Sequence, residues 1–322
     1  MTAASLPCLA VLIFYILSDP FGVIRSYSDY NKGPLTNPNR DVISSEIFLK
    51  NYPTYKYKSF IFGNSKTLAF LTTDWAKYIN DSVPYHFDAS LESLYGILTK
   101  LNYLDKNHDS IKNVLIVADE KLLENIKDTS SLLYIKDYKI AGTSVINYHL
   151  VFFNSFLNQF YFVRYTDYLL FKKYRPYMNG FLAHHPGNYT SVNNDLILTY
   201  ADSEIISDSL KYYNNTDIFY HRSEPGSYLK PALGTQQIDM LNKIKALFEK
   251  HNTSYKIIIS PSYSQQYLNE NDLKKLKEIF GEGDVFDFSG ENSYTDNIGN
   301  YYDDVHYKPY IGRSIMKKIY AK

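Results

Sequence analysis

Short, uninterrupted apolar runs alternate with stretches of helical periodicity along most of this chain. The clearest run is NVLIVA at 113–118, of the continuous kind that is buried on both faces of a parallel sheet. Four more predicted strands lie at 59–62, 85–87, 256–260 and 285–288. Apolar residues at helical spacing separate or follow them. The pattern predicts an α/β fold, a three-layer α/β/α sandwich with a mostly parallel sheet.

The alternation stops between about 127 and 235, where the chain is rich in aromatic residues and in Asn- and Ser-containing loops. We expect an insertion that caps one end of the sheet; a run of packing helices is the alternative. The α/β domain then covers 59–322 with this insertion inside it. Residues 25–58 are polar and contain three prolines, so we interpret them as a linker and lead-in.

The N-terminal segment, 1–24, contains an uncharged apolar run, AASLPCLAVLIFYIL at 3–17. A full membrane span needs about 20 apolar residues, and residues 21–24 extend this shorter run. We favour an uncleaved membrane anchor that leaves the main domain outside the cytoplasm, on the periplasmic or extracellular face. A cleaved signal peptide, which would make the protein secreted, and a buried core helix are the alternatives.

Composition excludes several classes of function. The chain has 34 basic and 34 acidic residues, which argues against a nucleic-acid partner. Its one cysteine, Cys8, excludes disulfides and thiolate metal sites in the folded domain. His184 and His185 are adjacent but have no carboxylate or cysteine at metal-ligand spacing. We therefore expect neither a metal nor a cofactor.

Two distant stretches contain residues suited to acyl transfer. In YYDDVHYKP (301–309), Asp303 lies three residues before His306, and a carboxylate can hold an imidazole as a general base. In FIFGNSKT (60–67), Ser65 follows an apolar run and opens a helix, where N–H groups favour an oxyanion. The alternatives are an N-cap at Ser65, a surface-loop His306 and an Asx-type turn at Asp303 and Asp304.

Strand order favours a shared site over these separate interpretations. Active residues of parallel α/β folds gather beyond the carboxyl ends of the strands. The residues that follow predicted strands are Ser65, Asp88, Ser90, Asp119 and the Asp303–His306 loop. We therefore predict Ser65 as nucleophile, His306 as base and then acid, and Asp303, rather than Asp304, as the group that orients His306.

These blocks resemble those of the SGNH (GDSL-like) hydrolase superfamily, whose fold is flavodoxin-like. More narrowly, the chain is similar to membrane-anchored SGNH-like proteins that act in O-acylation of bacterial cell-surface polysaccharides. Ser65 matches the nucleophile, and Asp303 and His306 match the D-x-x-H block. The resemblance implies a serine esterase or O-acyltransferase that acts on acyl esters, above all acetyl esters, of polysaccharide. It also implies a multi-span membrane acyltransferase as a candidate partner, and the aromatic insertion suggests a stacking wall for sugar rings.

The chain departs from this family where the oxyanion hole is expected. The family uses the serine N–H with a glycine and an asparagine of the middle blocks. Here Ala89 and Ser90 stand at the second block, and Ala118-Asp119-Glu120 replaces G-x-N-D. Asn64, Ser90 and Asp119 are therefore our candidates for oxyanion or substrate binding. The alternative function is a non-catalytic, membrane-tethered glycan-binding or assembly protein with a degenerate SGNH fold.

Overall fold

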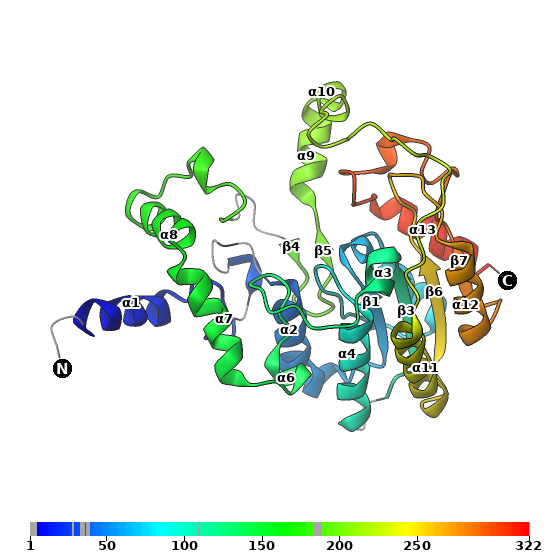
Figure 1. The fold of residues 1–322 in the computed structure, drawn as a ribbon, viewed down its shortest axis with the longest axis horizontal. Helices are drawn as coiled ribbons and strands as arrows, with labels where there is room; N and C mark the ends of the chain where they lie inside the picture. The colour runs from blue at the N-terminus through cyan, green and yellow to red at the C-terminus, as the bar shows by residue number, and fades with distance from the viewer. Residues whose placement is uncertain are drawn as a thin grey trace.

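The computed structural model describes residues 5–27, 29–32, 36, 39–107, 110–182 and 188–321. Its centre is a five-stranded sheet with helices on both faces (Figure 1). The strand order is β2-β1-β3-β6-β7, and every neighbouring pair is parallel. The strands are β1 Ser59–Gly63, β2 Tyr85–His86, β3 Asn113–Ala118, β6 Ser254–Ile259 and β7 Val285–Asp287. The expected α/β fold with a mostly parallel sheet is confirmed.

The order of the strands marks one edge of the sheet as the place for a site. The chain goes from β1 outward to β2, then returns past β1 to add β3, β6 and β7. The direction reverses between β1 and β3, and open parallel sheets bind ligands beyond the carboxyl ends of the strands at such a point. Ser65 follows β1 directly, and Asp119 follows β3.

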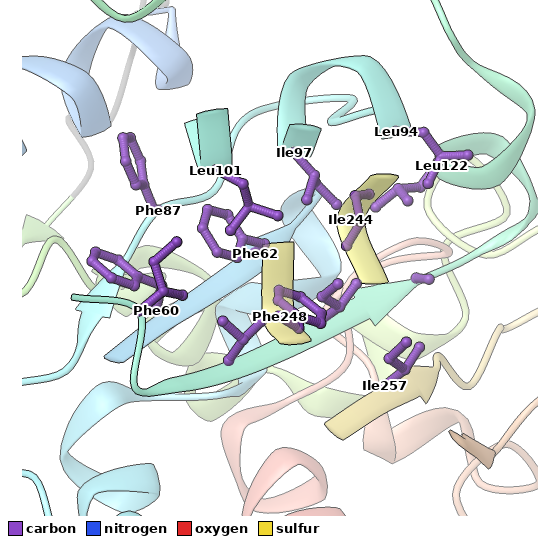
Figure 2. Close-up of a cluster of buried hydrophobic side chains, with 14 of the residues drawn as sticks. Phe60, Phe62, Phe87, Leu94, Ile97, Leu101, Leu122, Ile244, Phe248 and Ile257 are labelled. Atoms are coloured by element: carbon purple, nitrogen blue, oxygen red, sulfur yellow. The ribbon is translucent and has the colours of Figure 1, made fainter. Parts of the chain in front are cut away.

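One face of the sheet packs against α4 (Leu94–Lys106), α11 (Thr235–Lys250) and α12 (Glu270–Phe280). Phe60 and Phe62 of β1 point into this layer, toward Leu101 and Phe248 (Figure 2). The intervening Ile61 faces the opposite layer, because successive side chains of a strand alternate between faces. That layer contains α3 (Thr72–Ile79) and α13 (Pro309–Ile319).

The stretch expected to be a linker contains a helix of the core, α2 (Arg40–Tyr55). Asn39 caps it by accepting hydrogen bonds from the N–H groups of Asp41 and Val42. Ile43, Ile47 and Phe48 are buried, and the Phe48 ring stacks on Phe87 with centroids 4.9 Å apart. The interpretation as a linker is therefore wrong for this part of 25–58. The polar residues of this stretch suggested a solvent-exposed segment. Several of them are in fact buried, because they pair with residues that lie far away in the sequence.

A network of buried charges explains this polar start of α2. Asp41 pairs with Lys100 of α4 at 2.9 Å and with Lys136 of the insertion at 3.3 Å. Both lysines also pair with Glu92, and none of the four side chains is more than 6% exposed. Buried charges of this kind are tolerated only when they are paired and hydrogen-bonded. Each partner comes from a different segment, so no local pattern in the sequence reveals the network.

The N-terminal apolar run forms helix α1 (Ser5–Ser18), which packs on the insertion helices α7 (Val145–Leu157) and α8 (Gln159–Phe171). The Phe14 and Tyr15 rings contact Phe156 with centroids 6.0 and 5.1 Å apart. Among the described helices, none combines the length and apolar character needed to cross a membrane. The expected membrane segment therefore has no support in this structure.

The insertion reaches two separate parts of the domain. Besides α7 and α8 it contains α6 (Tyr138–Ala141), α9 (Thr199–Ser207), α10 (Ser209–Tyr213) and the hairpin of β4 (Asn188–Tyr189) and β5 (Leu196–Ile197). Helix α5 (Glu120–Glu124) lies just ahead of the insertion. Short 3-10 helices lie at η1 Tyr30–Lys32, η2 Ser65–Ala69, η3 Pro176–Met178 and η4 Ile298–Asn300. His184 and His185 lie outside the described residues.

A buried ion pair between α2 and the end of β2 also binds the hairpin loop of the insertion. The guanidinium of Arg40 donates to both carboxylate oxygens of Asp88, at 2.9 and 2.7 Å, and to Asn194 of the insertion. The Arg40 and Asp88 side chains are 5% and 0% exposed. Asp88 was predicted to lie at the edge of the sheet that holds the site. Its carboxylate is instead buried in a structural ion pair with Arg40.

We expect Arg40→Met to lower the free energy of unfolding by about 3–5 kcal/mol, because Asp88 stays buried without its partner. Arg40→Met combined with Asp88→Leu should recover a large part of the loss. Chemical denaturation followed by circular dichroism measures both. Lys50→Met, at an exposed position of the same helix, should stay within about 0.5 kcal/mol of wild type. A loss in Arg40→Met no greater than in this control would contradict the assignment.

Candidate functional site

Ser65 lies at the turn where β1 ends. Gly63 has φ +148°, and a Cβ there would overlap the Val117 carbonyl of β3, so glycine is needed for the chain to leave the sheet. Asn64 then caps η2 by accepting the Lys66 N–H at 3.0 Å. The helix expected to open at Ser65 is this short 3-10 turn, and α3 begins only at Thr72. Within the described chain, the Ser65 hydroxyl makes no hydrogen bond.

The Asp303–His306 pair has the geometry of an oriented base. His306 Nδ1 lies 2.8 Å from Asp303 Oδ2 and 3.0 Å from Oδ1. Asp303 Oδ1 also accepts the backbone N–H groups of Val305 and His306, so the Asx-type turn exists together with the ring contact. An ionised carboxylate can only accept, so this contact favours the tautomer with the proton on Nδ1, in which Nε2 is able to accept a proton. Asp303, rather than Asp304, is the partner of His306.

The pKa of Asp303 reflects this arrangement. Burial acts to raise it, but the hydrogen bonds and charge of His306, with the two backbone N–H groups, lower the pKa below its usual value. Asp304 shows the opposite direction: burial, and then the negative charge of Asp303, raise its pKa. Asp303 is therefore the ionised partner that an imidazolium needs.

Three contacts hold the Asp303–His306 loop and the helix after it next to η2 and the end of β6. The Tyr307 ring meets Phe70 edge-on with centroids 6.1 Å apart, and the Tyr307 hydroxyl lies 3.1 Å from Ser260 Oγ at the end of β6. In α13, a Cβ on Gly312 would overlap the carbonyl oxygen of Ala69, so the helix rests directly on the η2 backbone. The last block of the sequence therefore lies beside the first.

A pocket of about 450 Å³ joins the two blocks. Its lining includes Asn64 and Ser65 from the first block, and Asp304 and Val305, the neighbours of His306, from the last. Within the described chain, no hydrogen bond joins the Ser65 hydroxyl to the His306 ring. Such contacts are often long in ligand-free enzymes and tighten when substrate binds.

The insertion also holds the His306 loop. The Tyr302 hydroxyl donates to Asp202 of α9 at 2.9 Å, and Tyr212 of α10 donates to the Tyr302 carbonyl at 2.5 Å. Lys308, two residues after His306, donates to the Tyr213 hydroxyl at 2.6 Å. Helices α9 and α10 thus contact both ends of the loop.

Asp119 lines the pocket and has two structural contacts that the sequence did not predict. It caps α5 by accepting the Leu122 N–H at 2.9 Å, and it pairs with Lys66 at 3.2 Å. Burial acts to raise its pKa, but the Lys66 charge, the Leu122 N–H and the Asn64 amide lower it below the usual value. Asp119 is ionised and cannot donate to an oxyanion. It instead holds Asn64 and Lys66 in place.

The second block is not brought to the pocket through Ser90. Leu91, at φ +48°, lines the pocket instead, and Ser90 is absent from its described lining. The Ala89 N–H donates to the Gly63 carbonyl at 3.3 Å, which ties the block to the end of β1. This N–H is therefore occupied at the position where the resemblance to SGNH hydrolases predicts a glycine N–H in the oxyanion hole.

Sequence reasoning missed several polar residues of the pocket. Lys66 lies beside the predicted nucleophile, and Ser262, Ser264 and Gln266 follow the end of β6. The SPSYSQQ stretch after that strand was a usable signal, because polar residues beyond a strand end fall on the site edge.

The aromatic wall expected from the insertion is absent in the form predicted. Phe152, Phe156 and Tyr165 pack with α1 in a separate cluster, and Tyr220 is the insertion aromatic among the described pocket residues.

The described residues contain no group of three or more His, Cys, Asp or Glu side chains suited to a metal ion. A comparison of the sequence with models of known protein families gave no match, and a comparison with curated proteins gave no significant match.

We expect Asp119→Asn to lower the free energy of unfolding by about 1.5–3 kcal/mol at neutral pH, because it weakens charged hydrogen bonds. The folded pKa of Asp119 lies below its ordinary value of 3.8, so its contribution is present above about pH 4 and disappears as pH falls through the folded pKa. The difference between wild type and variant should shrink accordingly in denaturation measured from pH 7 to pH 3.

Glu120→Gln is a control of opposite sign. Burial and the charges of Glu124 and Asp119 raise the pKa of Glu120 above its ordinary 4.5. Wild type should therefore lose stability relative to this variant as pH rises past about 4.5. A difference for Asp119→Asn that does not change with pH would refute an ionised Asp119 at this place.

Proposed function

We propose that this protein is a serine-dependent acyl ester enzyme, an esterase or O-acyltransferase of SGNH-like type. The supporting observation is the Asp303–His306 pair, 2.8 Å apart, on a loop that shares one pocket with Ser65. Counted along the chain within the sheet, the strand order is 2-1-3-4-5, which is the flavodoxin-like order. That order supports the resemblance seen in the sequence blocks.

The chemistry divides into two half-reactions. In the first, Ser65 Oγ attacks the carbonyl carbon of an acyl ester while His306 Nε2 takes its proton. Asp303 stabilises the imidazolium that forms. The tetrahedral intermediate collapses, His306 returns the proton to the leaving alcohol oxygen, and the acyl group stays on Ser65.

The second half-reaction returns the enzyme to its starting state. His306 removes a proton from water or from a sugar hydroxyl, and that oxygen attacks the acyl-serine carbonyl. Collapse releases a carboxylic acid in the first case and an acylated sugar in the second, and Ser65 regains its proton. The proposed substrate is an acetylated or otherwise acylated polysaccharide outside the cytoplasm. A multi-span membrane acyltransferase is the proposed partner in the transferase case.

The polar wall of the pocket suits a carbohydrate. Ser262 and Ser264 share a hydrogen bond of 3.0 Å, Gln266 lies next to them, and Tyr220 adds an aromatic surface. Hydroxyl and amide groups together with an aromatic ring in one pocket can hydrogen-bond a sugar and pack against it.

A second candidate function is a glycan-binding or assembly protein without turnover. This function is favoured because the groups at the expected oxyanion-hole positions already bind other parts of the protein. The Ala89 N–H bonds Gly63, and Asp119 is ionised and engaged with Lys66 and Asn64. An oxyanion-hole donor removed from an acyl-transfer enzyme costs about 10²–10³ in kcat, so this difference bears directly on rate.

A fluorophosphonate probe on the full chain separates the two functions. We expect wild type to be labelled, Ser65→Ala not to be labelled, and His306→Ala to be labelled about 10²–10⁴ times more slowly because its general base is missing. Asp303→Asn should also slow labelling. Intact-mass spectrometry with time-resolved quenching gives the rates.

Ser262→Ala is the matched control, because this serine lines the same pocket. Its labelling rate should stay close to wild type. Labelling that survives in Ser65→Ala would refute the assigned nucleophile. An unlabelled wild type that still binds acylated glycan would favour the second function.

A further inference from the structure

Helices α1, α7 and α8 form a unit on the side of the molecule away from α12 and α13 (Figure 1). Aromatic contacts hold it together from within. Phe14 meets Phe162 edge-on with centroids 6.2 Å apart, and Tyr15 meets Phe153 at 5.1 Å. The inward-facing apolar side chains of these helices are therefore already buried against one another.

The outward side of the same helices is also apolar. Leu17 of α1 is 69% exposed, Ile146 of α7 is 70% exposed, and Leu170 and Phe171 of α8 are 71% and 65% exposed. Helix α1 has no charged residue, and α7 has no Asp, Glu, Lys or Arg. A helix in contact with water carries polar residues on its outer face, so this surface departs from the ordinary pattern.

The charges next to this surface are positive. Residues 5–27 and 142–182 contain five basic and two acidic residues, although the whole chain is balanced. Both acidic side chains are engaged: Asp19 accepts the N–H groups of Val23, Ile24 and Arg25, and Asp167 pairs with Arg175 at 2.7 Å. Lys172 and Lys173 follow Phe171 directly at the end of α8 and are exposed.

We propose that the outer face of α1, α7 and α8 lies in the interfacial layer of an anionic lipid bilayer. Apolar side chains would enter the boundary between headgroups and acyl chains, and Lys172 and Lys173 would meet the lipid headgroups. The insertion thus takes a direct part in membrane contact. A symmetric contact with a second copy fits less well, because it brings the two basic rims together. The proposal does not depend on the chemistry of Ser65.

Co-sedimentation of the full chain with vesicles tests the proposal. We expect binding to phosphatidylglycerol–phosphatidylcholine vesicles that weakens with added salt, and weaker binding to pure phosphatidylcholine. Ile146→Glu with Leu150→Glu, and separately Leu170→Glu with Phe171→Glu, should each reduce the partition coefficient at least about ten-fold, since charge in this layer opposes burial. Lys172→Glu with Lys173→Glu should reduce binding to the anionic vesicles by about 30-fold or more and change binding to pure phosphatidylcholine little.

Ile206→Glu with Leu210→Glu is the matched control. These side chains are 84% and 77% exposed, but they lie on α9 and α10. The control should bind vesicles as wild type does, and near-ultraviolet circular dichroism checks that every variant is folded. Ser65→Ala should also bind normally, which keeps this test separate from that of the proposed function.

Three results would overturn the proposal. Wild type that does not bind anionic vesicles excludes the membrane contact. Unchanged binding by the α7 and α8 variants would assign any contact to α1 alone. A wild-type dimer by multi-angle light scattering that these variants convert to a monomer would make the face an interface between copies.

Discussion

Helix α13 rests on the backbone of η2 at Gly312, where a side chain would overlap the Ala69 carbonyl oxygen. This contact links the two ends of the α/β domain, because η2 begins with Ser65 and α13 directly follows the His306 loop. A second close approach, at Gly63, sets the direction in which the chain leaves β1. The pocket depends on both glycines, since each removes a side chain where two backbones meet.

The insertion stabilises the site through polar contacts rather than through an aromatic wall. Asp202 and Tyr212 contact the His306 loop at Tyr302, and Asn194 meets the buried Arg40–Asp88 pair at the other end of the sheet edge. A segment that interrupts the strand–helix alternation therefore supports two parts of the domain. Its apolar residues instead pack with α1 and form the exposed outer face of α7 and α8.

Regular apolar patterns made the fold predictable. The features that depend on polar pairing between distant residues could not be predicted. All five strands were foreseen, because buried parallel strands are continuous apolar runs that need no partner to be recognised. Helix α2 was missed, because Arg40 and Asp41 are buried only through Asp88, Lys100 and Lys136, which lie far away in the sequence. The pairing of Asp303 with His306 was foreseen because it is local. The ion pair of Lys66 with Asp119 was not, because it joins two strand ends.

The sequence by itself determined the strands, the strand–helix alternation outside the insertion from residue 59 onward, and the local Asp303–His306 pair, since each follows from neighbours within a few residues. Only the tertiary structure decided which strand-end residues share the pocket. It placed Ser65 with Asp304 and Val305, removed Asp88 to a buried ion pair and made Asp119 a holder of Asn64 and Lys66. The physical reason is that burial and charge pairing depend on segments that meet only when the sheet is assembled.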